Sequence, residues 1–194
     1  KHKIPKDSFV ILYVGKLVSW KGVHNLIYAA SILKSKGVRN FVFAVAGKGA
    51  QKDNMLRLIA ETGTEDNFRF LDFISYDEMP EVYRMADILV LPSYPIMTWQ
   101  EQFGMVLVEA MASGVPVIAS DIPTLREILG DAALFVDPYR PDNIAISLKE
   151  LMSNQAEKEV LIKKGLERCR IYSWEKVAQE VIRVYESLDA RKRV

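Results

Sequence analysis

The sequence is poor in the residues that build disulfides and metal centres. Its 194 residues include one cysteine, Cys169, and two histidines, His2 and His24. A single thiol excludes an internal disulfide, which suits a reducing cytoplasm. Two histidines so far apart give no cluster with the spacing of metal ligands. We therefore expect a cytoplasmic protein that holds no metal.

Neither charge nor hydropathy is strongly biased. The formal net charge is +1, so no global field gathers nucleic acid and any anion binding has to be local. No apolar run approaches the roughly 20 residues of a membrane-spanning helix, and no signal peptide is evident. The chain begins with Lys1 and not with methionine, so we expect a segment of a longer protein.

Short apolar runs alternate with helical patterns along the chain. The predicted strands lie at 9–14, 41–46, 68–73, 88–91, 115–119 and 134–136. The predicted helices lie at 23–36, 52–61, 77–85, 105–111, 124–129, 142–152, 156–171 and 174–189. This alternation predicts an α/β fold: a Rossmann-like, doubly wound parallel sheet of about six strands with helices on both faces.

We expect a single domain over residues 1–194, in which residues 1–8 form a polar linker. The last predicted helix carries apolar residues with the spacing of core positions, namely Val177, Val181, Ile182, Val184 and Tyr185. The basic stretch at 191–194 is expected to be solvated.

Ligands of doubly wound sheets bind beyond the carboxyl ends of the strands. The loops at 15–21, 47–49, 73–76 and 92–101 should therefore meet at one rim. The first of them carries Lys16 and Lys21 beside a helix start, which suits a diphosphate. The plain alternative is that these lysines only add solubility.

The rest of the chain is organised around residues 99–120, WQEQFGMVLVEAMASGVPVIAS. Glu101 lies in a loop, and Glu109 lies eight residues further on, with seven residues between them, within a helix that starts near Met105. The amides at this helix start have few intrahelical partners and attract anions such as phosphate. Two glutamates alone are typical of a solvated face, so their surroundings decide the interpretation.

Those surroundings resemble the signature of retaining glycosyltransferases of the GT-B fold, family 4 (group 1). The residues in register with it are Glu101, Phe103, Gly104, Glu109, Ala110, Gly114, Pro116 and Val117. The resemblance runs from about residue 9 to 188 and covers only the C-terminal, donor-binding half of the architecture. It implies that the N-terminal, acceptor-binding domain is absent from this chain.

The resemblance also implies roles for individual residues. Lys16 and Lys21 would bind the donor diphosphate and stabilise its leaving charge, with Lys16 standing where the family has arginine. Glu101 would contact the transferred sugar, so the implied catalytic set is Glu101, Lys16 and Lys21. Glu109 would bind the ribose hydroxyls. The other implied donor-binding residues are Gly15, Gly47, Ile74, Phe103, Gly104, Met105 and Val106.

The implied function is transfer of a hexosyl group from a UDP-, GDP- or ADP-sugar, without metal or other cofactor. The acceptor would be a sugar or a lipid-linked sugar at the cytoplasmic membrane face, and the isolated domain would be inactive. Two alternatives stay open: a non-catalytic nucleotide-sugar-binding module, and an epimerase or phosphorylase of the same fold. Glu101 and Glu109 could also be the acid and nucleophile of a glycosidase. The loop with Lys16 and Lys21 makes this interpretation less favoured, because glycosidase sites rarely include such a diphosphate-binding turn.

Overall fold

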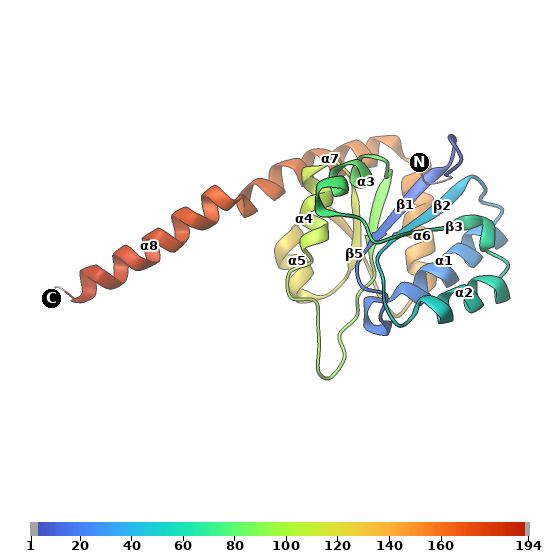
Figure 1. Cartoon of the computed structure of the whole chain (residues 1–194). Helices are drawn as coiled ribbons and strands as arrows, with labels where there is room; N and C mark the ends of the chain where they lie inside the picture. The colour runs from blue at the N-terminus through green and yellow to red at the C-terminus, as the bar shows by residue number, and fades with distance from the viewer. Residues whose placement is uncertain (1–3, 193–194) are drawn as a thin grey trace.

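The computed structural model describes the backbone of residues 4–192 and the side chains of residues 4–188. Within them, six strands form one parallel sheet in the order β3-β2-β1-β4-β5-β6 (Figure 1). The strands are β1 (Phe9–Val14), β2 (Phe41–Ala46), β3 (Phe68–Asp72), β4 (Ile88–Leu91), β5 (Val117–Ser120) and β6 (Ala133–Val136). This is a Rossmann-like strand order, so the predicted fold class is confirmed.

Helices cover both faces of the sheet (Figure 1). One face carries α1 (Val23–Ser35), α2 (Lys52–Glu61) and α6 (Pro141–Ser153). The other carries α3 (Met79–Arg84), α4 (Met105–Ala112), α5 (Pro123–Leu129) and α7 (Gln155–Arg168). Short 3-10 turns are η1 (Ser19–Lys21), η2 (Glu65–Asn67), η3 (Tyr76–Glu78) and η4 (Cys169–Tyr172).

The central strands form the core. Every residue of β2, β4 and β5 is buried, and β1 pairs with β2 along its whole length, from Phe9 opposite Phe41 to Val14 opposite Ala46. Parallel strands covered on both faces have no solvent side, which explains their continuous apolar runs. None of the helices in the described residues is long and apolar enough to cross a bilayer.

One strand begins later than the sequence pattern predicts. The pattern places it at 115–119, but β5 spans Val117–Ser120. The Val115 N–H donates to the carbonyl of Ala110 at 2.9 Å and so belongs to the end of α4. Pro116 has no N–H for a sheet ladder. Pro116 contributes only its carbonyl, which accepts from the Leu89 N–H at 2.9 Å, and the strand itself begins at Val117.

Two predicted helices are interrupted. The helix expected at 77–85 is the turn η3 followed by α3, with Pro80 in the first turn of α3, where its missing N–H costs nothing. The helix expected at 156–171 ends as α7 at Arg168 and continues as η4.

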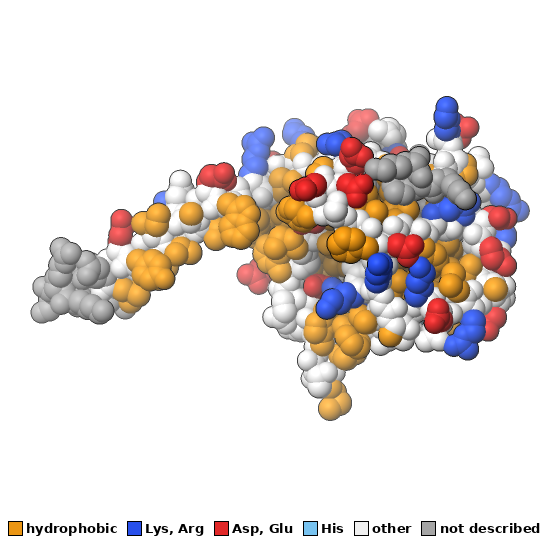
Figure 2. All heavy atoms as spheres, viewed as in Figure 1, with side chains coloured by type: hydrophobic (Ala, Val, Ile, Leu, Met, Phe, Trp, Pro, Cys, Tyr) orange, Lys and Arg blue, Asp and Glu red, His pale blue; other side chains and the backbone are white. Residues whose placement is uncertain are grey.

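The terminal helix α8 (Trp174–Lys192) projects away from the sheet (Figure 1), and hydrophobic side chains follow its length (Figure 2). The prediction that its apolar residues belong to the core is wrong, because all five are exposed: Val177, Val181, Ile182, Val184 and Tyr185. Helical spacing shows that residues share a face, not what covers it. The side chains of the basic stretch at 191–194 lie outside the described residues.

At the other end of the chain, residues 1–3 of the predicted linker lie outside the described residues. The remainder turns back on itself, as the Ser8 N–H donates to the carbonyl of Pro5 at 3.2 Å. Ile4 packs against the core, so this part of the linker is attached to the domain.

Candidate functional site

The site lies where the strand order reverses, at the carboxyl ends of β1 and β4. The loops after β1, β2 and β3 are tied together there by backbone hydrogen bonds. Gly15 N–H donates to Ala46 O at 3.0 Å, and Gly47 N–H donates to Asp72 O at 3.0 Å. A Cβ on Gly47 would lie 1.9 Å from the carbonyl oxygen of Gly15. The two glycine loops therefore pack too closely for any side chain at Gly47.

Lys21 and Glu101 form the centre of the site. The Lys21 ammonium lies 2.5 Å from Glu101 Oε2, although 80 residues separate them in the chain. Ser93, which is fully buried, donates to the same oxygen at 3.1 Å. Glu101 itself is only 7% exposed. The structure thus brings together a lysine and a glutamate that the sequence places in separate loops.

The negative charge of the Glu101 carboxylate affects the nearby hydroxyl of Tyr13. The pKa of the Tyr13 hydroxyl is raised by burial first and by the negative charge of Glu101 second. That hydroxyl donates to the backbone carbonyl of Lys16 at 2.9 Å and so fixes the β1 loop. The Lys16 side chain is exposed, and no partner holds its ammonium among the described residues.

Aromatic rings surround the Lys21–Glu101 pair. The Lys21 ammonium lies 5.0 Å from the ring centroid of Trp99, and Trp99 packs at 6.1 Å against Trp20. The Tyr94 N–H donates to the carbonyl of Trp20 at 2.9 Å, which joins the β4 loop to the β1 loop. These contacts shield one side of the ion pair from water.

A hairpin of residues 94–99 leaves the rim between Ser93 and Glu101 and projects from the domain (Figure 1). Ile96 and Trp99 pair as an antiparallel bridge, with N···O distances of 2.8 and 3.2 Å. Tyr139 donates to the carbonyl of Pro95 at 3.1 Å and supports the base. Met97, at the tip, is fully exposed.

The helix α4 starts directly after this loop. Gly104 caps it in the left-handed conformation, with φ 70°, which glycine adopts without strain. The first amides of α4, those of Met105 and Val106, have no intrahelical partner. The ring of Phe103 packs edge-on against Tyr172 at 5.2 Å, so its side chain is part of the framework and only its backbone is available to a ligand.

Glu109, within α4, is held by a residue that the sequence analysis missed. Tyr83 of α3 is 2% exposed, and its hydroxyl donates to Glu109 Oε2 at 2.5 Å. Burial, and then the bond to Glu109, raises the pKa of Tyr83, so this hydroxyl remains a donor at neutral pH. Helical periodicity assigns Tyr83 to the core and gives no sign that its hydroxyl reaches α4.

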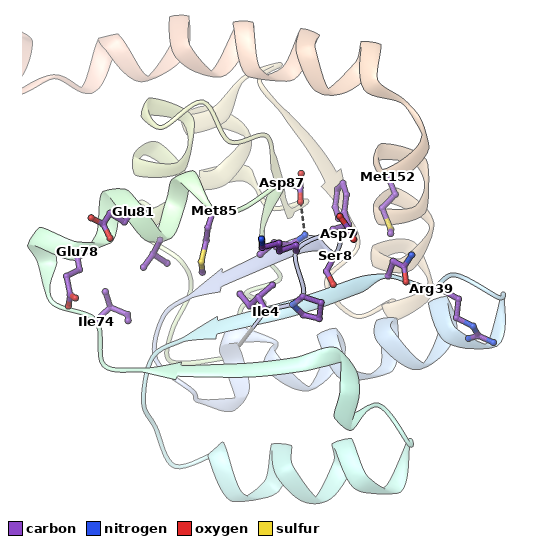
Figure 3. A pocket seen from close by; sticks show the side chains of 16 residues that line it. Ile4, Asp7, Ser8, Arg39, Ile74, Glu78, Glu81, Met85, Asp87 and Met152 are labelled. Atoms are coloured by element: carbon purple, nitrogen blue, oxygen red, sulfur yellow. Dashed lines mark hydrogen bonds between the residues drawn. The ribbon is translucent and has the colours of Figure 1, made fainter. Parts of the chain in front are cut away.

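Ile74 follows the carboxyl end of β3 and also lines a cavity of about 790 Å³ (Figure 3), and its role toward a donor stays a prediction. This cavity lies between the N-terminal segment and α3 and extends from the amino ends of β1 and β4 to Ile74 and Glu78, which follow β3. Its lining includes two cations, Lys6 and Arg39, and four carboxylates: Asp7, Glu78, Glu81 and Asp87. Because the carboxylates outnumber the cations, this cavity is less suited to a diphosphate than the lysine-bearing rim, and we do not place the diphosphate there.

The described residues contain no group of three or more His, Cys, Asp or Glu side chains that could hold a metal ion. The cations near the rim are lysines. Lys52 pairs with Asp72 at 2.5 Å, and Lys48 lies 5.7 Å from the ring of Phe73. The hydrogen bond to Lys52 lowers the pKa of Asp72.

Comparison with known proteins agrees with this fold. A family model described as glycosyl transferases group 1 matches residues 1–168. An uncharacterized glycosyltransferase, MJ1607, of Methanocaldococcus jannaschii is 31% identical over 186 residues, covering 94% of this chain and 46% of that protein. A D-inositol 3-phosphate glycosyltransferase of Corynebacterium glutamicum is 32% identical over 198 residues, covering 98% and 46%.

Two solved structures superpose closely. HepE from Anabaena, in complex with UDP and glucose, has a TM-score of 0.82 at 21% identity, over 93% of this chain and 49% of HepE. The C-terminal domain of the group 1 glycosyl transferase LpcC from Francisella tularensis has a TM-score of 0.72 at 26% identity, over 87% of each chain.

The sheet order and its structural neighbours define a Rossmann-like domain of the GT-B type. The chain belongs to the glycosyl transferases group 1 family. It spans about half the length of the curated relatives it matches.

Proposed function

We propose that the chain binds the nucleotide-diphospho-sugar donor of a retaining, family 4 hexosyltransferase. The Lys21–Glu101 pair carries this proposal, because it places an ammonium and a carboxylate at the carboxyl rim beside the first amides of α4. An ammonium has three N–H donors and Glu101 uses one, so Lys21 can hold Glu101 and a phosphate oxygen at once.

Each half of the donor then has a partner. Lys16, Lys21 and the amides after Phe103 stabilise the diphosphate as it leaves. Glu101 accepts a hydroxyl of the transferred sugar, and Glu109 accepts the ribose hydroxyls. Lysines and amides supply the positive charge, so the proposed site needs no metal or other cofactor.

The acceptor lies outside this chain in the proposal. An N-terminal domain would bind it, and the acceptor would be a sugar or a lipid-linked sugar at the cytoplasmic membrane face. The lone thiol of Cys169 suits that reducing compartment. HepE is described with UDP and glucose, which supports UDP as the first donor nucleotide to test.

A thermal-shift panel of UDP, GDP, ADP and their sugars tests the proposal, followed by titration calorimetry with and without EDTA. We expect one nucleoside diphosphate to bind, EDTA to leave its affinity unchanged, and the chain alone to transfer no sugar. A chain that binds none of these ligands contradicts the proposal. Rapid transfer, or epimerisation of the donor detected by NMR, contradicts the half-site arrangement.

A further inference from the structure

Each of the two site glutamates is held through one carboxylate oxygen by a buried hydroxyl. Tyr83 donates to Glu109 Oε2 at 2.5 Å, and Ser93 donates to Glu101 Oε2 at 3.1 Å. Tyr83 is 2% exposed and Ser93 0%. In the part of the chain that the structure describes, the Oε1 atoms of both glutamates receive no hydrogen bond.

The two hydroxyls come from the segments before and after β4 in the chain. Tyr83 lies in α3, which precedes the strand, and Ser93 lies just after the strand ends. Both are fixed by burial, whereas a glutamate side chain has three rotatable bonds and many rotamers. A short bond to a fixed donor therefore selects one orientation of each carboxylate, and it leaves the other oxygen to a ligand.

We propose that Tyr83 and Ser93 are positioning residues that divide donor recognition into two independent halves. Tyr83 orients Glu109 toward the ribose, and Ser93 orients Glu101 toward the transferred sugar. This inference rests on the donor-binding function proposed above.

Loss of each hydroxyl should change a different part of the ligand preference. Without the Tyr83 hydroxyl, Glu109 loses its fixed orientation, so the ribose 2′-hydroxyl contributes less to binding. The contact between Glu101 and the sugar does not change. Without the Ser93 hydroxyl, Glu101 Oε2 keeps only its bond to Lys21 and is less tightly oriented. The transferred sugar then contributes less to binding, while the contact between Glu109 and the ribose does not change. A general loss of packing would instead weaken every ligand alike.

Calorimetry on Tyr83→Phe and Ser93→Ala separates these outcomes. The ligands are UDP, 2′-deoxy-UDP and UDP-glucose, or the corresponding GDP or ADP compounds where the panel favours another base. We expect Tyr83→Phe to weaken UDP binding about three- to tenfold and to reduce the preference for UDP over 2′-deoxy-UDP. The affinity ratio of UDP-glucose to UDP should stay unchanged. Ser93→Ala should change that sugar ratio and leave the ribose preference intact.

Tyr172→Phe is the matched control for stability. It also removes a tyrosine hydroxyl bond, 2.9 Å long, to the carbonyl of Ile128. We expect its melting temperature to fall as much as that of Tyr83→Phe, with neither ligand ratio changed. In the Glu109→Ala background, Tyr83→Phe should have no further effect on ribose preference.

The outcomes distinguish the inference from the function beneath it. The inference is overturned where Glu109→Ala abolishes ribose preference but Tyr83→Phe leaves it intact, or where both hydroxyl variants weaken all ligands equally. The ribose role of Glu109 is overturned where Glu109→Ala keeps the wild-type preference. A wild-type chain that binds no nucleotide overturns both.

Discussion

Lys21 Nζ and Glu101 Oε2 lie 2.5 Å apart in a site closed by Ser93 and Trp99. The side chains of the pair are 19% and 10% exposed. Each charge neutralises the other before a donor binds, so the orientation of both side chains is already set. In the proposed function, a donor phosphate meets an ammonium that is already held in place.

Removing the lysine should affect binding and stability together. Lys21→Ala deletes the proposed phosphate ligand and leaves the Glu101 carboxylate with Ser93 alone. We expect nucleotide affinity to fall roughly ten- to a hundredfold and the free energy of unfolding to fall by about 1–3 kcal/mol. Calorimetry and urea denaturation measure the two effects. Lys36→Ala, at an exposed position, serves as the control and should change neither; an unchanged affinity in Lys21→Ala would remove the lysine from the site.

Glu109→Ala should weaken nucleoside diphosphate binding by roughly ten- to a hundredfold, because the ribose loses its carboxylate. It also leaves the buried Tyr83 hydroxyl without its acceptor. Titration calorimetry measures the affinity, and Glu127→Ala, on the exposed side of α5, is the matched control. Equal affinities for both variants would show that the ribose binds elsewhere.

Gly47→Ala should destabilise the rim. The added Cβ would meet the Gly15 carbonyl oxygen at 1.9 Å, so the two loops have to separate. Gly37→Ala is the comparison, since φ there is +76° but nothing lies within 4 Å of the added Cβ. We expect the free energy of unfolding to fall by about 1 kcal/mol in Gly37→Ala and by at least about 2 kcal/mol in Gly47→Ala. Only Gly47→Ala should also lose nucleotide binding. Equal melting temperatures for the two variants would contradict the close packing of the loops.

His24 should make stability depend on pH. Burial lowers its pKa below the usual value of about 6.5, and the ring of Tyr94 packs edge-on against it. The unfolded chain then binds more protons than the folded one, so stability is full above about pH 6.5 and falls as the pH drops toward the folded pKa. Melting temperatures from about pH 7.5 to 5.5 test this. His24→Gln should flatten the slope, and an equally steep slope in that variant would assign the effect to another group.

The sequence predicts the sheet well because parallel strands that are buried on both faces consist of consecutive apolar residues. The run at 41–46 and the strand β2 have identical bounds. Where a strand follows a helix directly, the sequence pattern does not show whether a backbone N–H bonds to the helix or to the sheet. For that reason β5 starts two residues later than predicted. The exposed apolar face of α8 has the spacing of a core helix, so only coordinates reveal that the described chain leaves it uncovered.

The site was only partly within reach of sequence reasoning. Loops at the carboxyl ends of parallel strands meet at one rim, so the sequence correctly predicts that the loops of Lys21 and Glu101 lie close together. Residue spacing cannot show that the two side chains bond to each other. Ser93 looks like a turn residue and Tyr83 like a core residue. Their hydroxyl bonds depend on side-chain direction across separate elements, which no local pattern encodes. The roles of these residues toward a donor remain predictions.

The hairpin at 94–99 begins next to Ser93 and ends next to Glu101, and those two residues bond to each other. This hydroxyl–carboxylate contact, together with the bonds of Tyr94 to Trp20 and of Tyr139 to Pro95, holds the base of the hairpin. Residues can be inserted or exchanged around Met97 without shifting the carboxylate, as exposed loop tips generally tolerate such changes. We therefore expect changes of sequence or length at the tip of this hairpin to leave the Ser93–Glu101 contact intact, so the tip is a suitable place to graft new residues.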